Sequence, residues 1–430
     1  MSGVNPPPAG SLANALHAAA VIITRVASGR SLSAELERAG DDGIVASRAA
    51  LIDLTHGTLR RFGRSQAIVR ALSRQDQGDP LVEALLWCAL YALESGRYAQ
   101  YTVVDQAVRA CGLLEKWPSK GFVNALLRRF LRERPVLDAR LRDDEETRYQ
   151  HPRWWIDTVR AAFPDQWEQI LEAGNTHPPM CLRVNRRRAD PQALCARLVT
   201  EGLAARRIGP VAVLLDTPVP VDRLPGFGEG AVSVQDAGAQ QAIDYLDLQP
   251  GQRVLDSCAA PGGKAAHILE TADVALTALD IDATRCARIE RNLERLGLAA
   301  AVKAADCRAL SSWWDGRVFD RVLADVPCSA SGIARRHPDI KWIRRATDTA
   351  AFAARQLQIL EALWPVLAPG GKLLYVTCSV FPQENDAVIE AFLAGAPNVR
   401  RLGLPASAPA QCLPNATRDG FFYALLEKPL

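Results

Sequence analysis

A chain of 430 residues is longer than one hydrophobic core usually organises, so it predicts two or three domains. Its 48% hydrophobic and 23% charged residues are those of an ordinary globular protein and exclude low-complexity or fibrous classes. The net charge of +3 is unevenly spread, because residues 1–140 hold 18 Lys or Arg residues against 13 Asp or Glu residues. This basic excess fits an accessory nucleic-acid surface and, equally well, ordinary solvated helix faces.

Three kinds of site or segment are not predicted. The ten cysteines form no Cys-x-x-Cys pair and the six histidines are scattered, so we expect no zinc or other metal site. The apolar run 18–24 is short and has no Lys or Arg before it, unlike a secretion signal. No apolar stretch is long enough to span a membrane. We therefore expect a cytoplasmic protein with free thiols and no membrane partner.

Residues 1–140 are predicted to form an all-α bundle. The Pro- and Gly-rich residues 1–10 are expected to be disordered. Ser11 is the predicted N-cap of a helix that runs to about Ser28. Further helical patterns cover 44–72, 80–96, 101–114 and 119–134. In the second of these, leucines recur at the spacing of a core-facing helix, at Leu81, Leu85, Leu86, Leu90 and Leu93.

Basic side chains gather on two of these helices. One predicted helix carries Arg60, Arg61, Arg64 and Arg70, and another carries Lys120, Arg128, Arg129, Arg132 and Arg134. Contacts with RNA phosphates and plain solvated surfaces explain both groups equally well. Asn124 lies among apolar residues and is expected to make a buried hydrogen bond rather than to act in catalysis.

Residues 141–230 predict a small α/β module. We expect a helix near 156–173, a strand at Met180–Asn185, a helix from Pro191 to about Gly202 and a strand near 211–215. Trp154 and Trp155 are expected to anchor the core. RNA contact is the preferred interpretation, over a plain surface, of the arginines beside the first strand, which are Arg183, Arg186, Arg187 and Arg188.

From residue 231 onward, strands and helices alternate to the end. The pattern predicts strands at 252–257, 273–280, 299–303, 319–325 and 371–377, and helices near 263–271, 283–297, 347–367 and 383–394. Such alternation favours a mostly parallel, doubly wound (Rossmann-like) sheet, whose ligands bind beyond the carboxyl ends of the strands. One active site is therefore expected at that edge, where the chain places the Pro261–Lys264 turn, Asp280, Asp306, Asp325 and Cys378.

The stretch Arg253-Val-Leu-Asp-Ser-Cys-Ala-Ala-Pro-Gly-Gly-Lys264 joins a short strand, a glycine turn and a helix start. Gly262 and Gly263 lack a Cβ, so backbone amides can approach a ligand closely. The turn is neither G-x-G-x-x-G nor a Walker A loop, which makes an NAD-dependent enzyme a weak alternative. Asp280 ends the next apolar strand, where an acid can bind the two ribose hydroxyls of a nucleoside.

Two cysteines are expected beside this nucleoside site. Cys328 follows the Asp325 strand in Asp-Val-Pro-Cys, and Cys378 follows the next predicted strand. Their loop positions favour function over packing. A lone buried cysteine is usually a small hydrophobic residue, and that is the role expected for Cys88, Cys111, Cys195 and Cys286.

These motifs resemble those of the bacterial 16S rRNA cytosine-C5 methyltransferases of the Sun/Fmu (RsmB) family over nearly the whole chain. The matching segments are Asp256-Ser-Cys-Ala-Ala-Pro-Gly-Gly-Lys264, Asp325-Val-Pro-Cys-Ser329, Arg335-Arg-His-Pro-Asp-Ile-Lys-Trp342 and Thr377-Cys-Ser379. Three departures remove no catalytic group. Val326 and Ser331 replace the usual alanine and threonine, and Gln383 replaces the first acid of a Glu-Glu-Asn run that ends here at Glu384-Asn385.

The resemblance implies an α+β multidomain fold. It consists of an all-α NusB-like RNA-binding bundle (1–140), a small α/β RNA-contacting module (141–230) and a Rossmann-like methyltransferase domain (231–430). The cofactor implied is S-adenosylmethionine. Asp280 would take its ribose hydroxyls, Asp306 would lie by the adenine, and Asp325 would face the reacting groups. Its amino-acid moiety would be wrapped by Cys258, Ala259, Ala260, Pro261, Gly262, Gly263 and Lys264.

The resemblance also assigns the catalytic roles. Cytosine C5 is too weakly nucleophilic to take a methyl group unaided, and a thiolate added at C6 raises the electron density at C5. Cys378 would be this nucleophile, Cys328 would serve enzyme release, and Asp325 would hold the N3/N4 edge of the base. The base must leave its stack to enter the pocket. Lys341 and Arg336 would hold flanking phosphate or serve structure.

The implied substrate is one cytosine of 16S ribosomal RNA, cytosine 967. The protein is expected to be a monomer and not to act on DNA. Three alternatives stay open. Another RNA such as tRNA is one possible target. A DNA cytosine methyltransferase would instead use the Pro-Cys dipeptide, making Cys328 the nucleophile. A non-catalytic NusB-like RNA-binding protein would need neither thiol.

Overall fold

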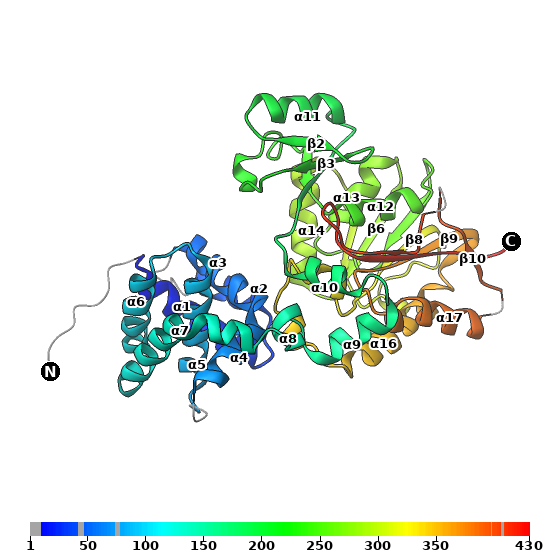
Figure 1. Cartoon of the computed structure of the whole chain (residues 1–430). Coiled ribbons are helices and arrows are strands. Elements are labelled where there is room, and N and C mark those ends of the chain that lie inside the picture. The colour runs from blue at the N-terminus through cyan, green and yellow to red at the C-terminus, as the bar shows by residue number, and fades with distance from the viewer. Residues whose placement is uncertain (1–9, 42–46, 74–77, 397, 406–407) are drawn as a thin grey trace. The chain divides into compact units, whose positions relative to one another are not determined.

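The computed structural model describes residues 10–41, 47–73, 78–396, 398–405 and 408–430. The described residues form two compact units, one from those within 1–176 and 334–346, and one from those within 177–333 and 347–430 (Figure 1). Of residues 1–10, which were expected to be disordered, residues 1–9 lie outside the described residues. Within the described ranges, no helix has both the length and the apolar character that crossing a membrane requires.

The first unit is helical, which confirms the all-α prediction for the described part of residues 1–140. Ser11 caps its first helix, because the Ser11 hydroxyl accepts a hydrogen bond from the Asn14 amide. The central helix α5 buries Leu85, Leu86 and Leu90 completely, which confirms the core-facing stripe. The helices are α1 (Leu12–Ala27), α2 (Leu32–Asp41), α3 (Arg48–Arg60), α4 (Phe62–Leu72), α5 (Pro80–Ser95), α6 (Gln100–Leu113), α7 (Lys120–Arg140), α8 (Glu145–Tyr149), α9 (Arg153–Ala162), α10 (Trp167–Asn175) and α15 (Ile340–Ile343).

Two segments that were each predicted to form one helix form two helices in the structure. The expected helix 44–72, whose residues 44–46 lie outside the described residues, breaks at Arg61, where the backbone leaves helical geometry with φ −114°. Arg60 and Arg64 therefore lie on different helices, and the prediction that one helix carries both is wrong. The expected helix 156–173 breaks at 163–166, where Pro164 cannot continue a helical hydrogen-bond ladder.

The segment 334–346 belongs to the helical unit although 157 residues separate it from the first segment of that unit, which ends at Thr176. Trp342 donates its indole N–H to the Leu59 carbonyl at 2.8 Å and lies against Phe62. Lys341 is fully buried and donates to the Asn175 side chain at 2.7 Å. Burial holds the pKa of Lys341 well below its usual range. A phosphate contact for Lys341 is therefore wrong, and its role is structural.

The second unit begins with a small antiparallel sheet in the order β2-β3-β1-β4. The predicted elements β1 (Met180–Val184), α11 (Pro191–Thr200) and β3 (Ala212–Leu215) are present. Two strands were not predicted, β2 (Ala205–Arg207) and β4 (Val232–Val234), because runs of three residues carry too little alternation to register as strands.

The large sheet has the order β10-β12-β9-β8-β5-β6-β7, with β11 paired to β12. Five neighbouring strands are parallel, as predicted, but the alternation does not hold to the end of the chain. The last long strand, β12, runs antiparallel between β9 and β10. The strands are β5 (Arg253–Asp256), β6 (Ala275–Asp280), β7 (Ala301–Ala304), β8 (Phe319–Asp325), β9 (Leu367–Thr377), β10 (Arg400–Leu402), β11 (Gln411–Cys412) and β12 (Phe421–Glu427).

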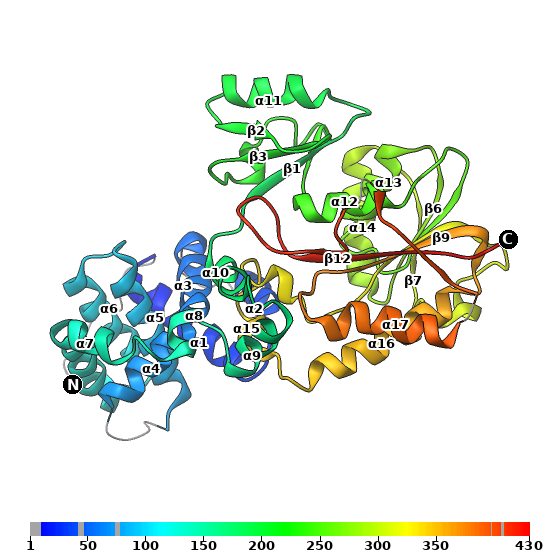
Figure 2. The ribbon, with the colours of Figure 1, turned by 45° about the vertical axis from the view of Figure 1, so that its right-hand side comes forward.

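Helices cover both faces of this sheet, so the doubly wound prediction is confirmed (Figure 2). One face packs against α12 (Ala237–Tyr245), α13 (Gly263–Thr271) and α14 (Ala283–Leu296). The other packs against α16 (Asp348–Leu363) and α17 (Asp386–Gly395). Because both faces are buried, the strands present their polar residues at their ends.

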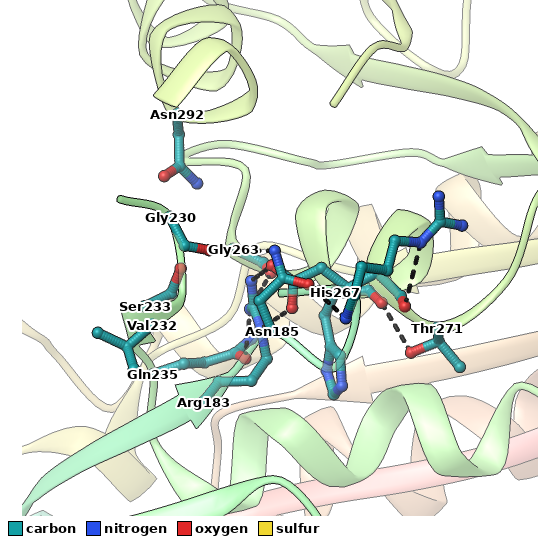
Figure 3. A network of polar contacts seen from close by, with 12 residues as sticks. Arg183, Asn185, Gly230, Val232, Ser233, Gln235, Gly263, His267, Thr271 and Asn292 are labelled. Atoms are coloured by element: carbon teal, nitrogen blue, oxygen red, sulfur yellow. Dashed lines mark hydrogen bonds and ion pairs between the residues drawn. The ribbon is translucent and has the colours of Figure 1, made fainter. Parts of the chain in front are cut away.

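Arg183 joins the small sheet to α13, and its predicted RNA contact is wrong (Figure 3). Its side chain is fully buried. The guanidinium donates to both carboxyl oxygens of Glu270, at 2.7 and 2.8 Å, and to the Gln235 side chain and the Gly263 carbonyl. RNA contact by the exposed neighbours Arg186, Arg187 and Arg188 stays a prediction.

Replacing Arg183 with Met is expected to lower the free energy of unfolding by about 3–5 kcal/mol, because it leaves the Glu270 carboxylate buried without its cation. Urea unfolding measures this loss. The exposed Arg186→Met variant is the control and should change the stability by less than about 0.5 kcal/mol. The double variant Arg183→Met with Glu270→Met should recover much of the loss. Equal stability of the two single variants would contradict a structural role for the pair.

Candidate active site

A cavity of about 410 Å³ opens at the carboxyl ends of the parallel strands. It is large enough for a nucleoside-sized ligand. Among the residues singled out from sequence, seven line it, namely Cys258, Ala260, Asp280, Asp306, Asp325, Cys328 and Cys378. Ala259, Pro261, Gly262, Gly263 and Lys264 are not lining residues. The strand-end argument therefore led to one common site, of which the glycines of the turn are not lining residues.

The two cysteines meet at this edge. Cys328 lies three residues after β8 and Cys378 directly follows β9, and these strands are parallel neighbours. Their sulfur atoms are 3.4 Å apart, within the range of an S–H···S hydrogen bond. That contact, followed by burial, holds the pKa of the Cys328 thiol well above its usual value. The two sulfurs are thus in direct contact at the cavity wall, and either thiol can be the donor of the hydrogen bond between them.

Asp325, which lines the cavity together with the two cysteines, forms an ion pair with Lys264. The Lys264 ammonium donates to Asp325 Oδ2 at 2.6 Å. Burial lowers the pKa of Lys264, but the attraction of Asp325 outweighs it, so the net direction is upward. Lys264 is therefore a charged partner that orients Asp325, whose carboxyl group lines the cavity.

The turn after β5 requires glycine for its own geometry. Gly262 has φ +96°, a backbone conformation that other residues resist. A Cβ there would also lie 3.1 Å from the Ile289 Cα atom of α14. The turn places the first residues of α13 next to β5, and Gly263 offers its carbonyl to Arg183. A direct contact of this turn with a cofactor stays a prediction.

Three further carboxyl groups surround the cavity. Asp256 ends β5 fully buried, and neither of its oxygens has a hydrogen-bond partner among the described residues. Burial, followed by repulsion from Asp325, raises the pKa of Asp256 to about 7. Asp280 accepts from the Ala260 amide and pairs with Arg285 at 3.4 Å. Asp306 pairs with Arg308, which lowers the pKa of Asp306.

This set of residues fits S-adenosylmethionine in its chemistry. The ligand carries a sulfonium cation, an ammonium group and two vicinal hydroxyls, all of which favour carboxylate partners. Asp280 and Asp306 line the cavity, and the unpartnered Asp256 lies beside it. Within the described ranges, no group of three or more His, Cys, Asp or Glu side chains is arranged to hold a metal ion.

Sequence reasoning missed part of the site. Cys307 lines the cavity, and its hydrogen bond with Cys258 lowers the pKa of the Cys307 thiol. Ser329 and Ser379 are buried directly behind the two cysteines, and both contact the buried carboxylate of Glu384. The motifs quoted from the sequence contain Ser329, Ser379 and Glu384, but they gave no sign that these three side chains contact one another. Nothing local to Glu384 indicated burial, since it lies between polar residues.

Three family models match the chain. Residues 243–427 match the 16S rRNA methyltransferase RsmB/F model, and residues 151–222 match the ferredoxin-like domain of RsmF/B-like methyltransferases. Residues 14–132 match the NusB family. The matches follow the chain in the order expected from sequence.

Relatives cover nearly the full length. Ribosomal RNA small subunit methyltransferase B of Vibrio cholerae is 43% identical, covering 97% of this chain and 98% of the relative. The protein of that name from Pseudomonas syringae pv. tomato is also 43% identical, covering 96% of each. Among solved structures, PH0851 is 24% identical with a TM-score of 0.81, covering 99% of this chain and all of that one, which shows the same fold. A methyltransferase homolog from Pyrococcus horikoshii is 27% identical over 67% of this chain and 98% of its own, with a TM-score of 0.59.

Proposed function

Because the chain belongs to the RsmB/F family of 16S rRNA methyltransferases, we propose that it methylates C5 of one cytosine in 16S rRNA, cytosine 967, through a covalent bond between Cys378 and C6. The observation that carries this proposal is the pair of sulfurs, 3.4 Å apart at the wall of a nucleoside-sized cavity. Two adjacent thiols at strand ends suit a reaction that must both form and break a bond to sulfur.

The chemistry assigns one task to each side chain. The Cys378 thiolate adds to C6 of the cytosine, forming the S–C6 bond and moving the electrons of the C5–C6 double bond toward C5 and the ring. Asp325, held by Lys264, contacts the N3/N4 edge and stabilises the proton that N3 takes up. The hydrogen of C5 then leaves as a proton to solvent, the electron pair of that C–H bond restores the C5–C6 double bond, and the S–C6 bond breaks with its electron pair returning to Cys378. Cys328, in contact with that sulfur, assists this release.

S-adenosylmethionine, when bound, supplies an electrophilic methyl group on a positively charged sulfur. We infer that Asp280 binds its ribose hydroxyls and that Asp306 lies by its adenine, because these acids line the cavity beyond β6 and β7. The Cys258–Lys264 turn is the proposed site of the amino-acid moiety. The unpartnered carboxyl group of Asp256, beside Cys258, supports a polar ligand on that side.

The proposed division of labour has three parts, residues 1–140 for RNA affinity, 141–230 for further RNA contact and 231–430 for chemistry. The exposed arginines support the first two. Arg128 and Arg132 lie on one exposed side of α7, four residues apart, and Arg186, Arg187 and Arg188 follow β1. By contrast, Arg64 is engaged with Glu94 and Asp138 and is not available for phosphate. The target base must be unstacked before it enters the cavity.

Reversing the charge of Arg128 and Arg132 together is expected to weaken rRNA binding about tenfold or more, and to reduce the dependence of the affinity on salt. Affinity for S-adenosylmethionine should stay within about twofold, since neither residue lines the cavity. Filter binding at several salt concentrations measures the first effect and calorimetry the second. The matched control reverses Arg288 and Arg291, two exposed arginines of α14. An equal loss of RNA affinity in the control would refute the assignment to the bundle.

The proposed activity is tested by incubating the purified chain with 16S rRNA and S-adenosylmethionine labelled in its methyl group. Bisulfite sequencing then maps the modified base, because 5-methylcytosine resists deamination. We expect one protected cytosine, position 967. The same mapping of cellular RNA with and without the gene identifies the natural target. A protected cytosine in tRNA but none in rRNA would mean that tRNA is the substrate. If neither RNA takes up the labelled methyl group, the chain is a non-catalytic RNA-binding protein.

A further inference from the structure

A groove of about 580 Å³ lies between α6 and α7, two helices that pack side by side in the helical unit (Figure 1). Its lining residues recur three or four positions apart along each helix, which keeps them on one face. They include Tyr101, Val104 and Val108 of α6 and Lys120, Asn124 and Arg128 of α7. On α7 the lining extends from Lys120 to Leu131, which makes the groove about 16 Å long at a rise of 1.5 Å per residue. That length accommodates several nucleotides of a strand.

The two most exposed aromatic side chains that the structure describes lie on this pair of helices and the turn between them. Tyr101 is 80% exposed at the start of α6 and lines the groove. Trp117 is 55% exposed in the short turn that joins α6 to α7. Tyr101 therefore adds little to the packing of the bundle. Exposed aromatic rings are the platforms on which the bases of single-stranded nucleic acids stack.

Two cations lie on the α7 side of the groove. Lys120 Nζ is 3.9 Å from the centre of the Trp117 ring, a cation–π contact that holds the ammonium group at one end of the groove. Arg128 is exposed, and its Nε donates to the Asn124 side-chain oxygen at 3.0 Å. The hydrogen bond expected for Asn124 is therefore made at the groove surface and not in the core. Because this bond uses Nε, the two terminal nitrogens of Arg128 can donate to a phosphate.

The charge of the groove favours an anion. Among its lining residues, Asp105 is the one carboxylate, and it pairs with Arg109 at 2.9 Å and accepts from the Gln106 side chain. Lys120 and Arg128 have no carboxylate partner in the part of the chain that the structure describes. The groove thus combines an exposed aromatic face with two cations that lack a counter-charge. Stacking platforms beside a positively charged groove are what single-stranded nucleic acids bind.

We propose that the α6–α7 groove binds an unpaired stretch of the RNA substrate, with one base stacked on Tyr101 and flanking phosphates on Lys120 and Arg128. This rests on the proposed function for the identity of the nucleic acid, and it specifies which surface of the bundle binds which structural class of RNA. The Asn124 side-chain amide donates to the edge of the unstacked base. Duplex RNA offers only phosphates here, because its base faces are covered by their neighbours. The two cations favour a polyanion over the apolar helix of a protein partner.

The test is the affinity of the full-length protein for a fluorescein-labelled single strand of RNA, about 12 nucleotides of mixed sequence, measured by fluorescence anisotropy. Tyr101→Ala should weaken binding about 5- to 100-fold, the loss expected when one base no longer stacks on an aromatic ring. Because Tyr101 is uncharged, the slope of log affinity against log salt concentration should not change. Arg128→Ala should instead reduce that slope by about 0.7, the value for one phosphate contact on a single strand.

Further variants separate stacking from apolar contact. Tyr101→Phe keeps the ring and should bind the strand within about twofold of the unmodified chain. Tyr101→Leu keeps an apolar side chain without a ring face, so it should lose affinity nearly as Tyr101→Ala does. The side chain is exposed, so all three variants should unfold at the same temperature as the unmodified chain. Val136→Ala is the matched control, because it removes an exposed apolar side chain of α7 outside the groove and should leave RNA affinity unchanged.

The same strand annealed to its complement should bind Tyr101→Ala and the unmodified chain equally, within about twofold. The proposal is overturned if the unmodified chain does not bind the single strand, if Tyr101→Ala binds it as tightly as the unmodified chain, or if the duplex shows the same loss. Tight binding by Tyr101→Leu would also overturn it, because the groove would then be an apolar surface suited to a protein partner.

None of these measurements depends on methyl transfer. A chain that methylates 16S rRNA but does not need Tyr101 for binding would keep the proposed function and lose this inference. A chain whose binding depends on Tyr101 but which transfers no methyl group would do the reverse.

Discussion

Replacing Cys378 with Ala is expected to abolish methyl transfer, lowering kcat by at least about 10⁴-fold. Without the thiolate, C5 of the cytosine has no added electron density, and the remaining residues can only bind and orient the base. Labelled methyl transfer to 16S rRNA measures the loss. RNA affinity and cofactor affinity should stay within a few-fold, because Cys378 contributes a small side chain to a cavity lined by many residues.

Cys286→Ala is the control for this variant. Cys286 is a buried residue of α14 and lies outside the cavity lining, so its loss should cost some stability but no activity at saturating substrate. An active Cys378→Ala protein would remove Cys378 from the role of nucleophile. It would favour instead the arrangement of a DNA cytosine methyltransferase, in which the Pro-Cys dipeptide supplies Cys328.

Replacing Cys328 with Ala is expected to trap a covalent protein–RNA complex. The Cys378 thiolate still adds to C6 and the methyl group is still transferred, but release is slowed because the neighbouring sulfur 3.4 Å away is missing. Turnover should fall about 100-fold or more while the adduct accumulates, a loss of the size expected for a missing acid–base group. Denaturing gel electrophoresis with end-labelled RNA detects the adduct as a slowly migrating band.

The double variant, Cys328→Ala with Cys378→Ala, should form no such band, because the sulfur that bonds to C6 is gone. If Cys328→Ala alone is inert and forms no adduct, while Cys378→Ala remains active, the assignment of the two cysteines is reversed. A protein that binds RNA equally well with and without both thiols, and never transfers a methyl group, would be the non-catalytic binding protein considered from the sequence.

Much of this molecule followed from local patterns. The leucine spacing of α5, the Ser11 cap and the alternation of apolar strands with amphipathic helices each depend on residues within a few turns of one another. Parallel strands with helical crossovers bring their carboxyl ends to one edge. That topology is why residues as distant as Asp280 and Cys378 were expected in one site, and why they now line one cavity. Their catalytic and binding roles stay predictions.

Features that depend on burial were decided by contacts between distant parts of the chain. Arg183 looked like a surface arginine because its partner, Glu270, lies 87 residues away. Lys341 could be read as a phosphate ligand because Asn175, whose side-chain oxygen accepts its hydrogen bond, is 166 residues away. Glu384 stood in a polar run, yet packing makes it the buried link between Ser329 and Ser379. A charged side chain carries no local mark of burial, since its desolvation is offset only by partners that the folded chain brings to it.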